Sequence, residues 1–199
     1  MLIVVTGPSG SGKSTILRHV MRDLRGVRFS VSHTTRPRRP SEKEGRDYYF
    51  VDRPEFERMI RRRAFVEWAV VHGELYGTSK REVADRGRSG DVILDIDVQG
   101  ARQVQALDLG AVFVFILPPA FRELRQRLAE RGEDKPAVVE SRLKTARKEI
   151  KDYARFDYIV INDRLDRAVL ELESIILASR CRLAARKARV GTILRSFEA

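Results

Sequence analysis

The residues with the clearest chemistry lie in a loop near the N-terminus. Residues 7–14 read Gly-Pro-Ser-Gly-Ser-Gly-Lys-Ser, which fits the pattern Gly, four residues, Gly-Lys-Ser. Glycines let the chain curl tightly, so that successive backbone N–H groups point at one anion. Lys13 brings an ammonium group to the phosphates of a nucleotide, and the hydroxyl of Ser14 can hold Mg²⁺. The loop therefore predicts a nucleotide phosphate site.

The segments on either side of this loop have the required pattern. Residues 2–5 are aliphatic and predict a strand, while residues 13–25 carry apolar side chains at helical spacing. A phosphate loop needs a strand before it and a helix after it, because the N-terminus of the helix also attracts anions. The alternative, a glycine-rich turn that binds nothing, does not require this context.

Two acids end a later hydrophobic segment. Residues 91–97 read Asp-Val-Ile-Leu-Asp-Ile-Asp, and the spacing of two places Asp95 and Asp97 on one side of a strand. An acid at the end of a hydrophobic strand beside a phosphate loop is the usual second ligand of Mg²⁺. Capping of the following helix is the alternative for Asp97. We expect Asp95, with Ser14, to hold Mg²⁺ directly or through water.

Arginines are concentrated in two further places. Residues 34–40 read Thr-Thr-Arg-Pro-Arg-Arg-Pro, a stiff loop whose guanidinium groups suit a phosphate, although a solvated basic loop explains them equally well. Arg127, Arg131 and Arg142 lie on two adjacent predicted helices, where they suit a lid that closes over phosphates. An ordinary charged helix surface is the alternative for these three.

Strands and helices are expected to alternate along the chain. We expect strands at 2–5, 28–33, 47–51, 64–71, 91–97, 111–117 and 158–161, and helices at 13–25, 54–63, 80–88, 99–107, 120–131, 136–154 and 164–185. Residues 75–79 are expected to form a turn and residues 186–199 a loose tail. This alternation predicts an α/β fold, a P-loop NTPase-type parallel sheet with helices on both faces.

The composition favours one domain inside the cell. The chain has 199 residues, of which 43% are hydrophobic, enough for a sizeable core. The single Cys181 excludes an internal disulfide and suits a reducing cytoplasm. We expect neither a signal peptide, since the first apolar run leads directly into the phosphate loop, nor a membrane span, which needs ~20 apolar residues.

The net charge of +11 allows two interpretations. A basic protein can bind nucleic acid, but no nucleic-acid motif accompanies the charge. An enzyme that handles two polyphosphates also needs excess positive charge, and residues 180–199 alone contain six basic side chains against Glu198. We therefore expect small-molecule phosphates, and neither nucleic acid nor a membrane, as partners. The three histidines show no metal-ligand spacing, and we treat His19, His33 and His72 as incidental.

Further motifs follow the phosphate loop in order. They are Gly-Pro-Ser-Gly-Ser-Gly-Lys-Ser-Thr at 7–15, Ser-His-Thr-Thr-Arg-Pro-Arg-Arg at 32–39, Gly-Arg-Asp-Tyr-Tyr-Phe at 45–50, Phe-Val-Glu-Trp-Ala at 65–69, Tyr-Gly-Thr-Ser at 76–79 and Leu-Asp-Ile-Asp-Val-Gln-Gly at 94–100. Through them the chain resembles the guanylate kinases, which are P-loop nucleoside monophosphate kinases. The resemblance covers residues 3–178 and is far more specific than the loop alone.

The resemblance implies a reaction and an organisation. The γ-phosphoryl group of ATP would pass to GMP, or dGMP, with Mg²⁺, in purine nucleotide metabolism and GMP recycling. Residues 1–199 would form one domain: a core (about 1–32, 80–124 and 151–185), a small mixed α/β GMP-binding region (about 33–79), a helical lid (about 125–150) and a basic tail (186–199). We expect a monomer or a homodimer in the cytoplasm.

The resemblance also assigns residues. The implied GMP contacts are Ser32, Arg36, Arg39, Tyr48, Glu67, Tyr76, Thr78 and Asp97. The implied ATP contacts are Gly7, Pro8, Ser9, Gly10, Ser11, Gly12, Lys13, Ser14, Thr15 and Arg127, with Asn162 near the adenine. The implied catalytic residues are Lys13, Arg39, Arg131 and Arg142.

The chemistry of guanine agrees with these assignments. Guanine has donors at N1 and N2 and an acceptor at O6, so its pocket needs carboxylates at one edge and a hydroxyl at another. Glu67 and Asp97 supply the carboxylates, and Ser32 or Thr78 the hydroxyl. Such a pocket rejects a base that lacks these groups by ~10⁴, because its buried acceptors are left unpaired.

Two other functions remain open at this stage. Some guanylate-kinase-like domains bind peptides without catalysis, but these have an impaired nucleotide loop, whereas Lys13, Ser14, Arg36 and Arg39 are all present here. A kinase of the same fold that phosphorylates another acceptor, such as a sugar phosphate, is the nearer alternative.

Overall fold

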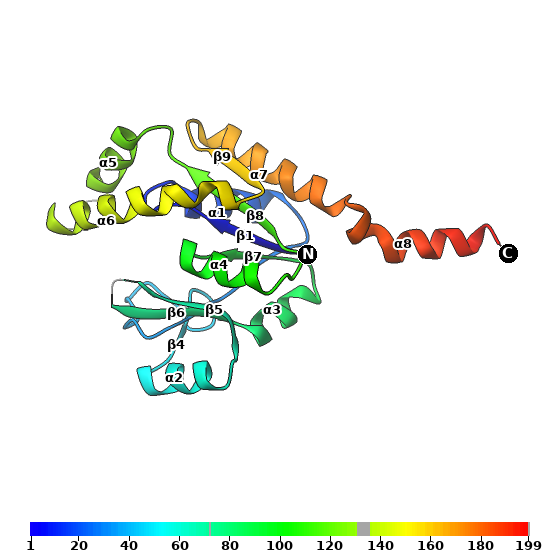
Figure 1. The fold of residues 1–199 in the computed structure, drawn as a ribbon, viewed down its shortest axis with the longest axis horizontal. Helices are drawn as coiled ribbons and strands as arrows, with labels where there is room; N and C mark the ends of the chain where they lie inside the picture. The colour runs from blue at the N-terminus through cyan, green and yellow to red at the C-terminus, as the bar shows by residue number, and fades with distance from the viewer. Residues whose placement is uncertain (72, 131–135, 199) are drawn as a thin grey trace.

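The computed structural model describes residues 1–71, 73–130 and 136–198 (Figure 1). The elements are, in order, β1 (Leu2–Thr6), α1 (Lys13–Asp23), β2 (Val27–Phe29), β3 (His33–Thr34), β4 (Tyr49–Phe50), α2 (Arg53–Arg61), β5 (Phe65–Val71), β6 (Glu74–Ser79), α3 (Lys80–Gly87), β7 (Asp91–Asp95), α4 (Val98–Ala106), β8 (Val112–Leu117), α5 (Phe121–Glu130), α6 (Pro136–Glu149), the 3₁₀ helix η1 (Ile150–Arg155), β9 (Tyr158–Ile161), α7 (Leu165–Arg180) and α8 (Leu183–Ser196).

A five-stranded parallel sheet forms the centre of the molecule. Its strand order is β2-β7-β1-β8-β9, and β1 is the central strand. Successive side chains of a strand point to opposite faces. Ile3 and Val5 pack in a core cluster with α1 and α7, whereas Leu2 and Val4 pack in one that includes residues of α4 (Figure 1). The predicted α/β fold, with a parallel sheet covered on both faces, is confirmed.

A second sheet lies beside the first and has its own small core. Its strand order is β4-β3-β6-β5, and it combines parallel and antiparallel pairs. Phe56 of α2 is fully buried against Phe65 of β5, with their ring centroids 4.5 Å apart. These elements lie within the residues 33–79 that were expected to form a separate region.

Two predictions about this second sheet were wrong. The residues expected to form a turn, 75–79, belong to strand β6, which pairs with β3 on one side and β5 on the other. The strand predicted at 28–33 is divided between the two sheets: β2 ends at Phe29, and β3 begins at His33. Between them the N–H of Val31 donates to Oε1 of Glu82 at 2.9 Å. The two residues are far apart in the sequence, so no local sequence pattern predicts this hydrogen bond.

The helical hairpin predicted over the two arginine-bearing helices is present. α5 and α6 share a small cluster that contains Leu124, Leu128, Leu143 and Ala146. α6 ends earlier than predicted, at Glu149, because the chain tightens into η1 before it enters β9. Residues 131–135, including Arg131, lie outside the described residues, as does His72.

The C-terminal residues differ most from the prediction. The last predicted helix ends at Arg180 rather than 185, and the expected loose tail is helix α8, which projects away from the rest of the molecule (Figure 1). The segment is rich in Ala, Leu, Arg and Lys, which favour a helix, but no core buries its apolar side chains. Among the described residues, no helix is long and apolar enough to cross a membrane.

Candidate functional site

The loop after β1 has the conformation of an anion site. Gly12 stands at the N-cap of α1 with φ +93°, in the left-handed region, and makes no side-chain cap. A Cβ there would meet Nδ2 of Asn162 at 2.1 Å, so only glycine fits. The first turn of α1 also contains no acid. Because the first N–H groups of a helix lack partners within the helix, an uncapped N-terminus is available to a phosphate.

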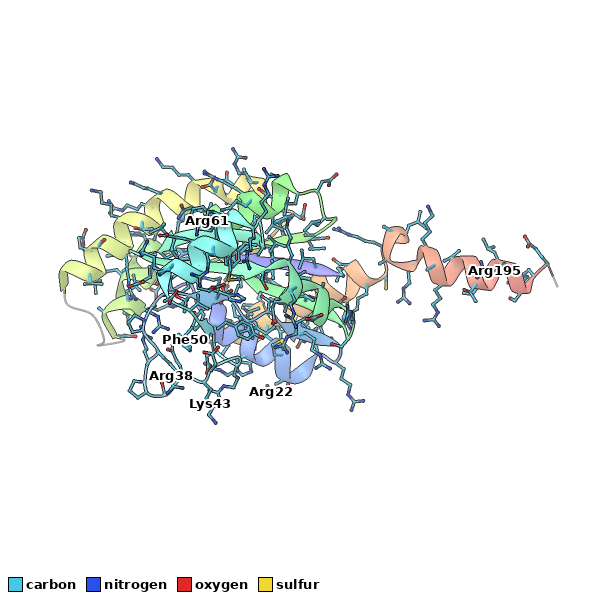
Figure 2. The ribbon with its side chains drawn as sticks, turned by 90° about the horizontal axis from the view of Figure 1, so that it is seen from below. Arg22, Arg38, Lys43, Phe50, Arg61 and Arg195 are labelled. Atoms are coloured by element: carbon cyan, nitrogen blue, oxygen red, sulfur yellow. The ribbon has the colours of Figure 1, made fainter. Side chains whose placement is uncertain are left out.

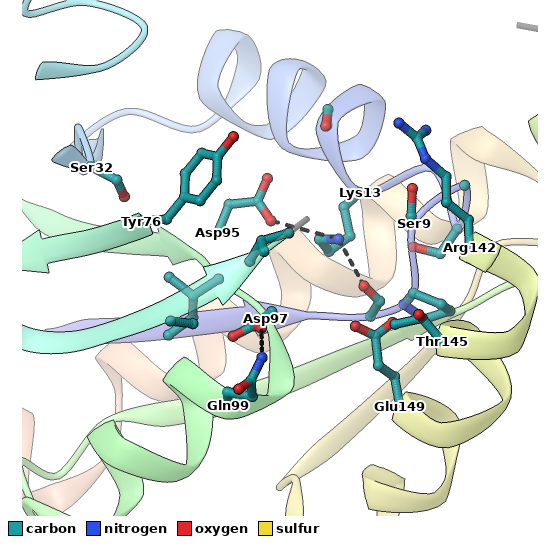
Figure 3. Close-up of a pocket in the computed structure, with 18 of the residues that line it drawn as sticks. Ser9, Lys13, Ser32, Tyr76, Asp95, Asp97, Gln99, Arg142, Thr145 and Glu149 are labelled. Carbon is teal, nitrogen blue, oxygen red and sulfur yellow. Dashed lines mark hydrogen bonds and ion pairs between the residues drawn. The ribbon is translucent and has the colours of Figure 1, made fainter. Parts of the chain in front are cut away.

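Lys13 is held over this loop by two oxygens. Its Nζ donates to the carbonyl of Gly7 at 2.8 Å and lies 3.8 Å from Oδ1 of Asp95 (Figure 3). Asp95 reaches this position because β7 pairs with β1 in a register that sets it opposite Val5. Burial raises the pKa of Asp95, and the ammonium of Lys13 opposes that rise. The structure therefore brings together a cation, an acid and the loop.

One cleft of about 510 Å³ opens beside this group (Figure 3). It is lined by residues of the loop, of both sheets and of α4 and α6. The predicted site residues on its wall are Gly7, Pro8, Ser9, Gly10, Ser11, Gly12, Lys13, Ser14, Ser32, Tyr48, Glu67, Tyr76, Asp95, Asp97 and Arg142. Arg36, Arg39, Thr78, Thr15, Arg127 and Asn162 do not line it. Residues as far apart in the sequence as Gly7 and Glu149 thus face one cavity.

Glu67 is a buried carboxylate of the cleft with a strongly raised pKa. It is only 4% exposed, and burial raises its pKa to about 7. The N–H of Thr78 donates to its Oε1 at 2.7 Å and opposes that rise, while the charge of Asp97 adds to it. A buried carboxylate with spare acceptor capacity at a cavity wall is suited to accept hydrogen bonds from a ligand.

Asp97 and Ser32 lie on the same side of the cleft as Glu67. β7 ends at Asp95, so Asp97 is not part of the strand. Its Oδ1 instead caps α4 by accepting from the N–H of Gly100 at 2.8 Å. The alternative expected for Asp97 is therefore correct, although the residue also faces the cavity (Figure 3). The hydroxyl of Ser32 lies 3.1 Å from that of Thr78, which is buried behind it.

The rings of Tyr48 and Tyr76 line the cleft near the arginine-rich loop, and the guanidinium of Arg36 contacts both of them from outside the cleft wall. Nε of Arg36 donates to the hydroxyl of Tyr76 at 3.2 Å, and its guanidinium lies 5.5 Å from the ring centroid of Tyr48. The rings of Tyr48 and Tyr76 meet edge to face at 5.8 Å. Burial raises the pKa of Tyr48, which keeps its hydroxyl protonated as a donor. Arg39 is exposed.

Asn162 and Arg127 lie behind the loop rather than in the main cleft. Nδ2 of Asn162 donates to the carbonyl of Ser11 at 2.7 Å, and Nη2 of Arg127 donates to the carbonyl of Asn162 at 3.0 Å. Both residues line a second hollow of about 410 Å³, together with Gly10, Gly12 and Thr15. They hold the loop through the carbonyl of Ser11 from this second hollow.

The hairpin contributes residues that the sequence did not single out. Thr145 and Glu149 of α6 line the main cleft beside Arg142 (Figure 3). Burial raises the pKa of Glu149, and the charge of Lys13 opposes that rise. Thr145 and Glu149 follow Arg142 by three and seven positions, so helical spacing would have identified both residues once its side of α6 was known.

The sequence also missed the groups that hold Glu67 in place. A Cβ on Gly100 would meet Oε2 of Glu67 at 2.5 Å, so only glycine lets the start of α4 approach this carboxylate. The side chain of Gln103 accepts from the N–H of Trp68 and donates to its carbonyl, which fixes the strand residue next to Glu67. Gln99 lines the cleft and donates to Asp97 at 2.9 Å.

Two of the three histidines, His19 and His33, lie within the described residues. His33 packs against the rings of Tyr49 and Phe65, and burial lowers its pKa, while His19 lies near Arg22 on α1. Within the described residues, no group of three or more histidine, cysteine and acidic side chains is placed to hold a metal ion.

The parallel sheet, the phosphate loop with its lysine, and a second binding surface across one cleft define a P-loop nucleoside monophosphate kinase. The family model described as "Guanylate kinase" matches residues 1–179. The chain belongs to the guanylate kinase family.

Proteins across bacteria are similar to this chain over most of their length. It is 48% identical to a guanylate kinase of Dechloromonas aromatica over 189 residues, which are 94% of each chain. It is 45% identical to one of Thermotoga maritima over 92% of this chain and 88% of that one. The crystal structure of guanylate kinase from Anaplasma phagocytophilum superimposes with a TM-score of 0.72 at 31% identity, over 91% of this chain and 87% of that one.

Proposed function

We propose that the protein transfers the γ-phosphoryl group of ATP to GMP, and to dGMP, to give ADP and GDP or dGDP. One observation carries this proposal: a single cleft holds the phosphate loop with Lys13 at one end and the buried Glu67, beside Asp97, at the other. The relatives named above are guanylate kinases, which supports the same reaction. Purine nucleotide metabolism, including recycling of GMP, is the corresponding cellular role.

The acceptor base would be read by the carboxylate side of the cleft. Glu67 would accept hydrogen bonds from guanine N1–H and N2–H₂, with Asp97 as the second acceptor. The hydroxyls of Ser32 and Thr78 would face O6, since they already lie within 3.1 Å of each other near Glu67. None of these contacts needs the 2′-hydroxyl of the ribose, which is why dGMP is expected to react as well.

The phosphate of the acceptor would lie toward Arg36, Arg39, Tyr48 and Tyr76. Its second pKa is near ~6, so it is largely ionised at neutral pH and needs no general base to attack. The obstacle is repulsion between two anions. Lys13, Arg39, Arg131 and Arg142 would lower it by placing positive charge around the transferring group.

The donor nucleotide would use both sides of the phosphate loop. The loop residues from Gly7 to Thr15 would cradle its phosphates, and the second hollow, lined by Arg127 and Asn162, would receive the adenosine. Arg142 already lines the main cleft from the hairpin, which we propose to be the lid. Closure of a lid over residues 125–150 would exclude water, which otherwise competes for the phosphoryl group.

Ser14 and Asp95 have the right chemistry for Mg²⁺. Both present oxygen ligands to the cleft. Burial raises the pKa of Asp95 despite the nearby ammonium of Lys13, and a bound cation would favour its ionised form. Mg²⁺ needs few protein ligands, because it retains several waters and binds substrate phosphates, so two protein oxygens are enough. Bound Mg²⁺ would neutralise charge on the β- and γ-phosphates.

A coupled assay for ADP formation tests the proposal. Purified protein with ATP and Mg²⁺ is offered GMP, dGMP, AMP, UMP and ribose 5-phosphate in turn. We expect GMP and dGMP to react fastest, by ~10⁴ over AMP, because AMP leaves the buried acceptors unpaired. Chelation of Mg²⁺ should abolish turnover, and added Mg²⁺ should restore it. Faster use of a sugar phosphate, or no ATP consumption with GMP, would overturn the assignment.

A further inference from the structure

The loop that carries the predicted phosphate arginines also contains an acid, Glu42. Its Oε1 accepts from Nη2 of Arg36 at 2.6 Å, and its Oε2 accepts from the backbone N–H of Arg39 at 2.8 Å. The N–H of Glu42 donates back to the carbonyl of Arg39 at 3.1 Å. The side chains of Arg36 and Glu42 are only 18% and 14% exposed. One carboxylate is therefore shared by both arginine positions.

This contact differs from the other ion pairs around it. Arg46 and Asp47 are neighbours on the same exposed loop, and such pairs contribute little. Arg38 and Lys43 extend outward from the loop, away from the sheets (Figure 2). Glu42, in contrast, turns inward, where Arg36 also contacts the hydroxyl of Tyr76 and the ring of Tyr48, both at the cleft.

We propose that Glu42 is a positioning residue for the acceptor phosphate: it orients Arg36 and fixes the turn that presents Arg39, without touching the nucleotide. This inference rests on the proposed function, because it assumes that these arginines bind the phosphate of GMP. It adds Glu42 to the residues of the phosphate site, although its negative charge is the opposite of what an anion site needs.

The remaining donors of Arg36 agree with this role. A guanidinium has five N–H donors in a fixed plane. Three of them are used, by Tyr76, by Glu42 and by the carbonyl of Pro37 at 2.8 Å. The other two have no hydrogen bond among the described residues. A guanidinium fixed on three sides with two donors left is preorganised for a phosphate, since little rotamer freedom remains to be lost on binding.

The charge of Glu42 makes the test decisive. A negative charge near a phosphate weakens binding directly, so removal of that charge alone should tighten the binding of GMP. If Glu42 acts mainly by positioning, its removal should weaken binding instead, because Arg36 and the turn at Arg39 lose their fixed geometry. The two roles therefore predict changes of opposite sign.

The variants are Glu42→Gln and Glu42→Ala, with Glu44→Gln as the matched control. Glu44 belongs to the same loop, but its carboxylate accepts from the N–H of Phe50 rather than from an arginine. We expect the KM for GMP to rise about tenfold in both Glu42 variants, equivalent to 1.4 kcal/mol. The kcat and the KM for ATP should change less than about threefold, and Glu44→Gln should resemble the wild type.

Guanosine, which lacks the phosphate, separates positioning from a general loosening of the pocket. We expect its inhibition constant to be the same in the wild type and the Glu42 variants, while that of GMP rises. Equal weakening of guanosine and GMP, or a fall in thermal stability that accounts for the loss, would overturn the proposal. Unchanged or tighter binding of GMP would also overturn it. Failure of the wild type to phosphorylate GMP would instead refute the proposed function itself.

Discussion

The two ends of the cleft differ in the groups that line them: one is mainly backbone and the other mainly side chains. The end that we propose to bind the phosphates of ATP, called the phosphate end, consists mainly of backbone: one loop between β1 and α1 supplies N–H groups, and Lys13 is its principal charged side chain. The end that we propose to bind the acceptor, called the acceptor end, consists of side chains from separate elements, among them Ser32 before β3, Glu67 of β5, Tyr76 of β6 and Asp97 at the start of α4. The first needs a short segment with the right local conformation. The second needs several segments to be packed in register.

This difference has a consequence for mutation. At the phosphate end, the N–H groups are placed mainly by the local backbone, with support from Asp95 and Asn162, so a change of the Lys13 side chain should remove chemistry and leave the fold intact. At the acceptor end, each side chain is held by others, so changes should mainly alter the recognition of the acceptor. The following predictions test this division.

The largest effect is expected for Lys13→Met. The variant loses the charge that acts on the transferring phosphoryl group, and we expect kcat to fall by at least ~10³, near the upper range for one electrostatic group. The fold should persist, as checked by circular dichroism and thermal unfolding. Lys80→Met, at an exposed position at the start of α3, is the control and should retain full activity. A near-normal rate for Lys13→Met would mean that the phosphate site is misplaced.

A smaller loss is expected for Glu67→Gln. An amide offers one acceptor and introduces a donor toward guanine N1–H, so we expect kcat/KM for GMP to fall by ~10² while the KM for ATP is unchanged. Steady-state kinetics with each substrate varied in turn measure this. Glu74→Gln on the same sheet is the control, because Glu74 contacts Thr35 and does not line the cleft. An equal weakening of the binding of GMP and of ATP would contradict the assignment of the two substrates to different ends of the cleft.

Arg39→Lys should weaken the binding of GMP to a smaller extent. An ammonium cannot reproduce the two parallel hydrogen bonds of a guanidinium to a phosphate, and we expect the KM for GMP to rise ~10-fold with a smaller effect on kcat. Arg38→Lys, at the exposed neighbouring position, provides the comparison and should behave like the wild type. An unchanged KM for GMP in Arg39→Lys would count against its assignment.

The smallest expected effect is the pH dependence caused by Glu67. Its pKa is raised to about 7, and the proposed hydrogen bonds from guanine need the ionised form, so affinity for guanine should fall as the pH drops through 7. Between pH 7 and 6 the ionised fraction of such a group decreases about fivefold, and the inhibition constant of guanosine should rise by that factor. Guanosine avoids titration of the GMP phosphate itself. The profile should become flat in Glu67→Gln; a flat wild-type profile would show that Glu67 does not accept the hydrogen bonds of guanine.

Much of the fold and one end of the site could be predicted from sequence because their causes are local. The run at 2–5, the glycines and Lys13 lie within a dozen residues, and their order specifies a strand, a loop and a helix without knowledge of anything distant. The same holds for the alternation of strands and helices, which leads to a parallel sheet with both faces covered. Neighbouring parallel strands end at the same edge of a sheet, so Asp95 and Asp97 could be placed near the phosphate loop from sequence.

The tertiary structure alone decided the rest. β6 was misread as a turn because its stability comes from pairing with β3 and β5, and α8 as a loose tail because no buried face imposes a strong period on it. The depth at which Glu67 is buried depends on Gly100, 33 positions away, and the orientation of Arg36 depends on Glu42, Tyr76 and Tyr48 together. Loss of water around a carboxylate and the fixing of a guanidinium are properties of packing between segments. The sequence identifies these residues, but the burial of Glu67 and the orientation of Arg36 are determined by the packing of the folded chain.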